Sequence, residues 1–123
     1  MAHNPVGWFE IYVQDMARAR AFYQTVLDIA LERLPGTGVE MWSFPMRPET
    51  AGAPGALVRD PGKPSGGNST VVYFVCADCA VQAGRVQAAG GSVSRDKFAI
   101  GPYGFIALVK DSEGNLIGLH SMQ

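Results

Sequence analysis

The feature that most constrains the fold is a repeated order of predicted elements. The segment Val13-Gln14-Asp15 aligns with Cys76-Ala77-Asp78 when the two halves of the chain are superposed. In each half, an apolar strand precedes an aspartate at a helix N-cap position, and a helix and three further strands follow. One such unit leaves an apolar sheet face uncovered. The sequence therefore predicts an α+β fold of two βαβββ modules that form an open, incomplete barrel, within one chain or across a dimer.

The elements are predicted from periodicity and from turn-forming residues. In the first half, strands are predicted at residues 7–14, 29–34, 39–45 and 55–59, with a helix at 16–27. In the second half, strands are predicted at 69–77, 92–95, 105–110 and 116–120, with a helix at 80–89. Residues 60–68 are rich in Pro, Gly and Ser and are interpreted as a linker. Residues 1–123 are thus predicted to form one domain, with module one at about 5–60 and module two at about 69–121.

Composition excludes several classes of function. Hydrophobic residues make up 47% of the 123 residues and charged residues 17%, which is unlike a disordered chain. The formal net charge of −1 gives no electrostatic case for binding nucleic acid or an anionic membrane. No apolar run is long enough to cross a bilayer, and the first residues lack a signal-peptide pattern. With only two cysteines, the chain is interpreted as a soluble cytoplasmic protein.

Several segments carry a family resemblance. They are Trp8-Phe9-Glu10-Ile11, Val13-Gln14-Asp15, Ala21-Phe22-Tyr23, Ala88-Ala89-Gly90-Gly91, Gly104-Phe105 and the run from Asp111 to His120. Together with the paired module order, they resemble the vicinal oxygen chelate superfamily of glyoxalase I, extradiol dioxygenases and bleomycin-resistance proteins. The subgroup related to lactoylglutathione lyase is the most similar. The resemblance implies a small-molecule ligand and a homodimer.

The resemblance also implies a divalent metal held by His, Glu or Gln side chains from four strands. Aligned on Val13-Gln14-Asp15, the corresponding positions are Trp8, Ala56 or Val58, Val71 and Gly118. None of these side chains can ligate a hard divalent ion. We therefore expect the usual four-ligand set to be absent. We also expect that the protein does not isomerise the methylglyoxal–glutathione adduct efficiently.

Two polar residues lie two positions further along the outer strands. Strand side chains alternate, so Glu10 shares a face with Trp8, and His120 shares a face with Gly118. Glu10 and His120 are therefore candidate catalytic residues, acting as a general acid/base pair. A displaced divalent-metal site at the same two residues and a purely structural pair are the alternatives.

Five aromatic side chains are candidate ligand-binding residues. They are Trp8, Tyr12, Trp42, Tyr73 and Tyr103. Tyr and Trp combine a large apolar surface with one polar group, which suits a ligand site, although the same rings can also be ordinary core. Trp8 at a metal-ligand position indicates either a collapsed pocket or a stacking surface for a flat ligand.

Two further motifs are interpreted as structural features without a catalytic or metal-binding role. Cys76-Ala77-Asp78-Cys79 has the spacing of a redox motif but lacks its other residues, so inert thiols are expected. The segment Asp111-Ser112-Glu113-Gly114-Asn115 is interpreted as a hairpin turn and not as a calcium loop.

Three functions follow from these expectations. The first is a small-molecule lyase or isomerase related to lactoylglutathione lyase, with Glu10 and His120 at its centre. The second is a non-catalytic protein of the bleomycin-resistance type that binds a drug or antibiotic between aromatic walls. The third is a structural or regulatory dimer with a degenerate pocket.

Overall fold

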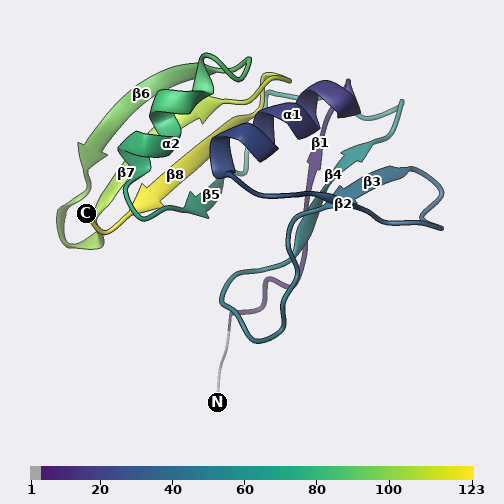
Figure 1. Ribbon diagram of the computed structural model, residues 1–123, viewed down its shortest axis with the longest axis horizontal. Coiled ribbons are helices and arrows are strands. Elements are labelled where there is room, and N and C mark those ends of the chain that lie inside the picture. The colour runs from purple at the N-terminus through teal and green to yellow at the C-terminus, as the bar shows by residue number, and fades with distance from the viewer. Residues whose placement is uncertain (1–3) are drawn as a thin grey trace.

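The computed structural model describes residues 4–123 and contains two βαβββ units (Figure 1). The first unit comprises β1 (Phe9–Tyr12), α1 (Met16–Leu27), β2 (Glu32–Arg33), β3 (Glu40–Ser43) and β4 (Gly55–Arg59). The second comprises β5 (Val72–Val75), α2 (Cys79–Val86), β6 (Ser92–Ala99), the 3-10 turn η1 (Gly101–Tyr103), β7 (Phe105–Lys110) and β8 (Leu116–Ser121). The strands form two four-stranded sheets, ordered β1-β4-β3-β2 and β5-β8-β7-β6. The predicted α+β fold with paired modules is confirmed, and no closed barrel forms.

Both helices begin at the predicted aspartates. The side chain of Asp15 accepts a hydrogen bond from the backbone N–H of Arg18, and that of Asp78 accepts one from Ala80, each at 3.0 Å. These contacts satisfy backbone donors that the first helical turn would otherwise leave unpaired. At the other end of α1, Asp28 adopts a left-handed conformation with a φ of 54°, which stops the helix.

One hydrophobic core serves both units. The inward face of α1 buries Ala19, Phe22, Tyr23 and Val26, in line with their helical spacing. The corresponding residues of α2 are Cys79, Ala83 and Val86. The two helices contact each other, and they lie next to one another in the upper part of Figure 1, with α2 to the left of α1. The core therefore lies on the helix side of both sheets.

Strand register assigns each residue of the first sheet to a face. Paired residues on neighbouring strands point to the same side of a sheet. Leu57 pairs with both Ile11 and Trp42, so these three residues face the core. Glu10 pairs with Ala56 and Tyr12 with Val58, so Glu10 and Tyr12 point away from the helices. We call the side of each sheet opposite the helices its outer face.

The second sheet has an outer face of the same kind. Leu119 pairs with Phe74 and Ala107 on the core side. Gly118 pairs with Tyr73, and His120 pairs with Val75, on the outer face. Within residues 4–123, no helix is long and apolar enough to cross a membrane.

Candidate functional site

The strongest candidate site is a carboxylate held between two aromatic residues on the outer face of β1. The indole Nε1–H of Trp8 donates to Glu10 Oε2 at 3.1 Å, and the hydroxyl of Tyr12 donates to Glu10 Oε1 at 2.9 Å. Alternation along the strand puts the three side chains on one side. Glu10 is exposed, Trp8 is 39% exposed and Tyr12 is half-buried. The hydrogen bond to Glu10 raises the pKa of Tyr12, so the phenol stays protonated at neutral pH.

A cleft opens beside this group, between β1 and the second sheet. Its volume is about 330 Å³, which is at the lower end of small-molecule sites. Glu10 and Tyr12 line it, as do the apolar side chains of Val72, Leu116 and Ile117. The cleft thus combines apolar walls with one carboxylate.

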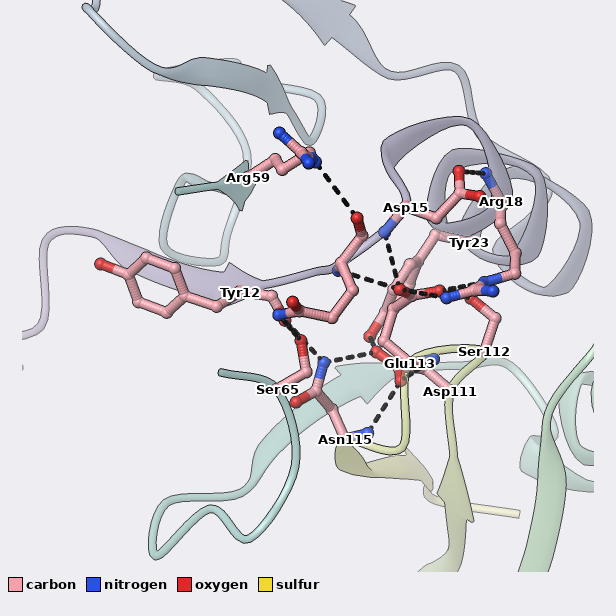
Figure 2. Close-up of polar contacts among 11 residues, drawn as sticks. Tyr12, Asp15, Arg18, Tyr23, Arg59, Ser65, Asp111, Ser112, Glu113 and Asn115 are labelled. Carbon is pink, nitrogen blue, oxygen red and sulfur yellow. Dashed lines mark hydrogen bonds and ion pairs between the residues drawn. The ribbon is translucent and has the colours of Figure 1, made fainter. Parts of the chain in front are cut away.

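Hydrogen bonds from the second unit fix the end of β1 that carries Tyr12. The backbone carbonyl of Tyr12 accepts from Ser65 Oγ at 2.6 Å and from Asn115 Nδ2 at 3.0 Å. Figure 2 shows the Tyr12 ring pointing away from these contacts. The main chain of Tyr12 is therefore held while its side chain remains available at the site.

The same network includes a contact between the two units, centred on Glu113, that was not predicted from the sequence (Figure 2). Glu113 Oε1 accepts the backbone N–H groups of Gln14 and Asp15, both at 2.9 Å, and Arg18 Nε donates to Oε2 at 2.7 Å. Burial acts to raise the pKa of Glu113, but these hydrogen bonds, led by that of Arg18, lower it to about 2. The segment from Asp111 to Asn115 forms the predicted turn. Nothing in the residue types of this segment indicated that the turn also contacts the first unit.

His120 lies on the outer face of β8, and its partner is not Glu10. His120 Nε2 lies 2.7 Å from the backbone carbonyl oxygen of Tyr103. A carbonyl can only accept, so Nε2 carries the hydrogen and Nδ1 is the acceptor in the neutral ring. Among residues 4–123 no hydrogen bond or ion pair joins Glu10 to His120, and His120 does not line the cleft beside Glu10. The structure does not bring the two candidate catalytic residues into contact within one chain.

Tyr73 covers the position where the superfamily would place its last metal ligand. The ring of Tyr73 lies against the backbone of Gly118, so a Cβ atom at position 118 would overlap its Cδ1 and Cε1 atoms. Tyr73 itself is 47% exposed on the outer face. An aromatic surface therefore occupies the space of a ligand side chain.

The residues present do not fit the implied metal. The Trp8 N–H is already donated to Glu10, and Ala56 and Val58 are buried aliphatic side chains. In the part of the chain that the structure describes, no group of three or more His, Cys, Asp or Glu side chains could hold a metal ion. The four positions taken from the superfamily therefore form no metal site.

Two of the aromatic candidates lie apart from the others. Trp42 points to the core side of its sheet, where its Nε1–H donates to Glu40 at 3.1 Å. The guanidinium carbon of Arg20 lies 3.4 Å from the centroid of the Trp42 ring. Tyr103, in η1, is 72% exposed and contacts His120 through its backbone carbonyl. The register thus places Tyr12 and Tyr73 on the outer faces of β1 and β5, and Trp8, which directly precedes β1, is joined to Tyr12's side by its hydrogen bond to Glu10.

The two cysteines do not form a surface-accessible pair. Cys76 and Cys79 are both buried free thiols. Burial raises the pKa of Cys76 to about 11, which keeps its thiol protonated at neutral pH.

Comparison with known proteins agrees with this architecture. Residues 6–27 match the family described as bleomycin resistance protein-like N-terminal. A search of curated proteins found no match. Among solved structures, the chain is similar to TnmS3, an antibiotic binding protein from Streptomyces sp. CB03234. The two share 27% sequence identity and a TM-score of 0.71, with 98% of each chain covered.

Two further structures show the same fold at lower identity. A glyoxalase-related enzyme from Fulvimarina pelagi has 19% identity and a TM-score of 0.73, covering 97% of this chain and 88% of that one. A glyoxalase I mutant from Zea mays has 21% identity and a TM-score of 0.73, covering 96% of this chain and 47% of that one. This chain therefore spans about half of the maize protein. The sheet order and these matches bear out the resemblance drawn from the sequence: the chain has the fold of the glyoxalase/bleomycin-resistance proteins of the vicinal oxygen chelate superfamily.

Proposed function

We propose that this protein binds a planar aromatic small molecule on the outer faces of its sheets and does not transform it. The observation that carries the proposal is the replacement of metal ligands by aromatic surface. Trp8 stands at one ligand position, and the ring of Tyr73 covers another at Gly118. Exposed aromatic rings bind flat apolar ligands by stacking and by burying area.

Two further observations support a binding role. The polar groups at the centre of the site are engaged with one another, because Trp8 and Tyr12 both donate to Glu10. TnmS3, at 27% identity, is an antibiotic binding protein, which favours a ligand of that class for this chain. The protein would then act by sequestering its ligand, in the cytoplasm.

The proposed binding unit is a homodimer. On the outer face of the second sheet, Val75 is 89% exposed and Tyr73 is 47% exposed. Exposed apolar side chains gathered on one sheet face are typical of a surface that another chain covers. A second copy placed there would extend the aromatic surface and bury Val75.

The test is a calorimetric titration of the protein with acridine and 9-aminoacridine at pH 8, followed by chromatographic recovery of both compounds. We expect saturable binding of at least one compound, with unchanged compound recovered in full. Trp8→Ala and Tyr73→Ala should each weaken binding by about tenfold, because each removes a stacking ring worth about 1 kcal/mol or more. If neither compound binds, or if Trp8→Ala and Tyr73→Ala bind as the wild type does, the proposal is wrong.

A lyase or isomerase is the second candidate. His120 favours it, because the carbonyl of Tyr103 fixes the tautomer and leaves Nδ1 able to take a proton. This candidate requires either Glu10 and His120 to meet at an interface between copies or a metal to join them. Stoichiometric metal in the purified protein, lost in both Glu10→Gln and His120→Ala, would establish it over the binding role.

A further inference from the structure

We propose that the ligand carries a positive charge, such as a protonated amine, and that Glu10 binds it between the rings of Trp8 and Tyr12. The inference rests on the proposed binding function and names the chemical class of the ligand. It depends on the geometry of one carboxylate, on its lack of a basic partner and on a comparable arrangement elsewhere in the chain.

The carboxylate is oriented but not saturated. Each of its oxygens accepts one hydrogen bond, from Trp8 on one side and from Tyr12 on the other. A carboxylate oxygen has two acceptor sites, so each oxygen can accept one more donor. A protonated amine brings several N–H donors and a charge, and charge-assisted hydrogen bonds are the stronger kind.

Among the residues that the structure describes, Glu10 also has no basic partner. Within residues 4–123 the ion pairs are Arg18 with Glu113 and Lys97 with Asp78, and neither involves Glu10. Lys63 approaches only the ring of Tyr12, with its Nζ 5.9 Å from the centroid. The carboxylate of Glu10 is therefore exposed beside an apolar cleft, and among residues 4–123 no basic group is paired with it.

The flanking rings strengthen the case for a cation. The face of an indole or phenol ring carries negative potential and attracts cations. A ligand with a flat apolar body and a cationic group can stack its body on these rings and place its charge at Glu10. An anionic ligand would meet the carboxylate with like charge.

The chain contains a second carboxylate–indole pair, and a cation lies on it. Glu40 accepts the Nε1–H of Trp42 at 3.1 Å, with the same two-residue spacing as Trp8 and Glu10. There the guanidinium of Arg20 stacks over the Trp42 ring at 3.4 Å. Among residues 4–123 no cationic side chain lies over the ring of Trp8. On β3 the cation contacts the indole ring and not Glu40, so this pair shows that an indole ring held by such a hydrogen bond can receive a cation on its face.

The test compares matched tricyclic compounds by calorimetric titration at pH 8, where 9-aminoacridine is cationic, acridine is neutral and acridine-9-carboxylate is anionic. The wild type should bind 9-aminoacridine about tenfold more tightly than acridine, which corresponds to about 1.4 kcal/mol from a charge pair beside aromatic rings. This preference should shrink as salt is added. The carboxylate compound should bind most weakly.

Variants test whether Glu10 is the residue that causes the preference for the cationic compound. Glu10→Gln should reduce the preference for 9-aminoacridine over acridine to about twofold or less. Glu10→Lys should favour acridine-9-carboxylate. Glu40→Gln is the matched control, because it alters the carboxylate of the other indole pair on the core side, and it should keep the wild-type preference. Thermal unfolding of each variant checks that it is folded.

The outcomes separate the two proposals. Equal affinity for the cationic and neutral compounds, or a preference that survives in Glu10→Gln, overturns the inference and leaves the binding function standing. Binding of none of the three compounds overturns the binding function, and the inference with it.

Discussion

Glu113 shows how one side chain can hold two units of a fold together. Its carboxylate accepts two backbone N–H groups at the start of α1 and is paired with Arg18. The side chain of Glu113 is fully covered, whereas that of Arg18 is 53% exposed. A buried acceptor of several donors is costly to remove, because the donors lose their partner.

Glu113→Gln should therefore destabilise the protein by about 2 kcal/mol at pH 7, within the range for hydrogen bonds to a charged group. The pKa of Glu113 is lowered from 4.5 to about 2 in the folded protein. Its stabilising effect is therefore present above pH 4.5 and is lost as the pH falls towards 2. Urea unfolding of both proteins at several pH values between 7 and 2.5 measures the difference, which should narrow as the pH falls. A difference that does not change with pH would contradict this account.

At the scale of single elements, the pairing of β5 with β8 determines the position of one ring of the proposed binding site. Gly118 lets the ring of Tyr73 lie flat against the backbone of β8. This close approach gives Tyr73 a fixed position on the outer face, and a side chain at position 118 would displace the ring.

Gly118→Ala should therefore cost about 1 kcal/mol in the free energy of unfolding and weaken acridine binding, because the added methyl overlaps the ring. The matched experiment places the same substitution in Tyr73→Ala. With the ring absent, Gly118→Ala should change stability little, so chemical unfolding of the four proteins should reveal coupling. Additive effects on stability would show that the ring does not lie on Gly118.

Helices and strands were predicted correctly where capping residues and the spacing of apolar residues match the way the element packs in the fold. Asp15 and Asp78 were correct as helix caps, and the helix at 16–27 has the predicted bounds. β6 runs to Ala99 instead of ending at 95, because register shifts after Val93 and Arg95 break the alternation that marks a strand. β2 covers only Glu32–Arg33, although a longer strand was predicted.

The positions of site residues were predictable where alternation along a single strand determines which face a side chain lies on. The shared face of Trp8, Glu10 and Tyr12 followed from period two, and the hydrogen bonds between them agree with it. The separation of Glu10 from His120 could not be predicted, since it depends on how two sheets are arranged. The core-side position of Trp42 depends on the pairing of β3 with β4, which the sequence alone does not supply.

At the scale of the whole molecule, the proposed dimer and the proposed binding site both use the outer faces of the two sheets. Trp8, Tyr73 and Val75 on these faces stay exposed within one chain, so a second copy or a ligand is needed to cover them. The four positions that the superfamily resemblance assigns to metal ligands carry Trp, Ala or Val, Val and Gly, none of which can ligate a hard divalent ion.

Val75→Asp should convert the proposed dimer into monomers, because a charge at this 89% exposed position would have to be buried in the interface. Light scattering after size-exclusion chromatography measures the mass directly. Val81→Asp is the control, since Val81 is 50% exposed on α2, away from the outer faces, and should leave the mass unchanged. A wild-type protein of monomer mass would refute the dimer.

The protein should not isomerise the methylglyoxal–glutathione adduct efficiently, even with added nickel or zinc. The reason is that Trp8, Ala56 or Val58 and Gly118 supply no ligand side chain. A spectrophotometric assay with each metal checks this, and metal-dependent turnover that is proportional to protein concentration would contradict it.

The central claim, a binding site on the aromatic outer faces, is tested most directly by an NMR titration of the isotopically labelled protein with 9-aminoacridine. We predict that amide resonances of residues 8–12 and of Tyr73 and Gly118 shift in a saturable way, while those of residues 40–42 do not. Shifts confined to residues 40–42, or no shifts at all at saturating compound, would contradict the account.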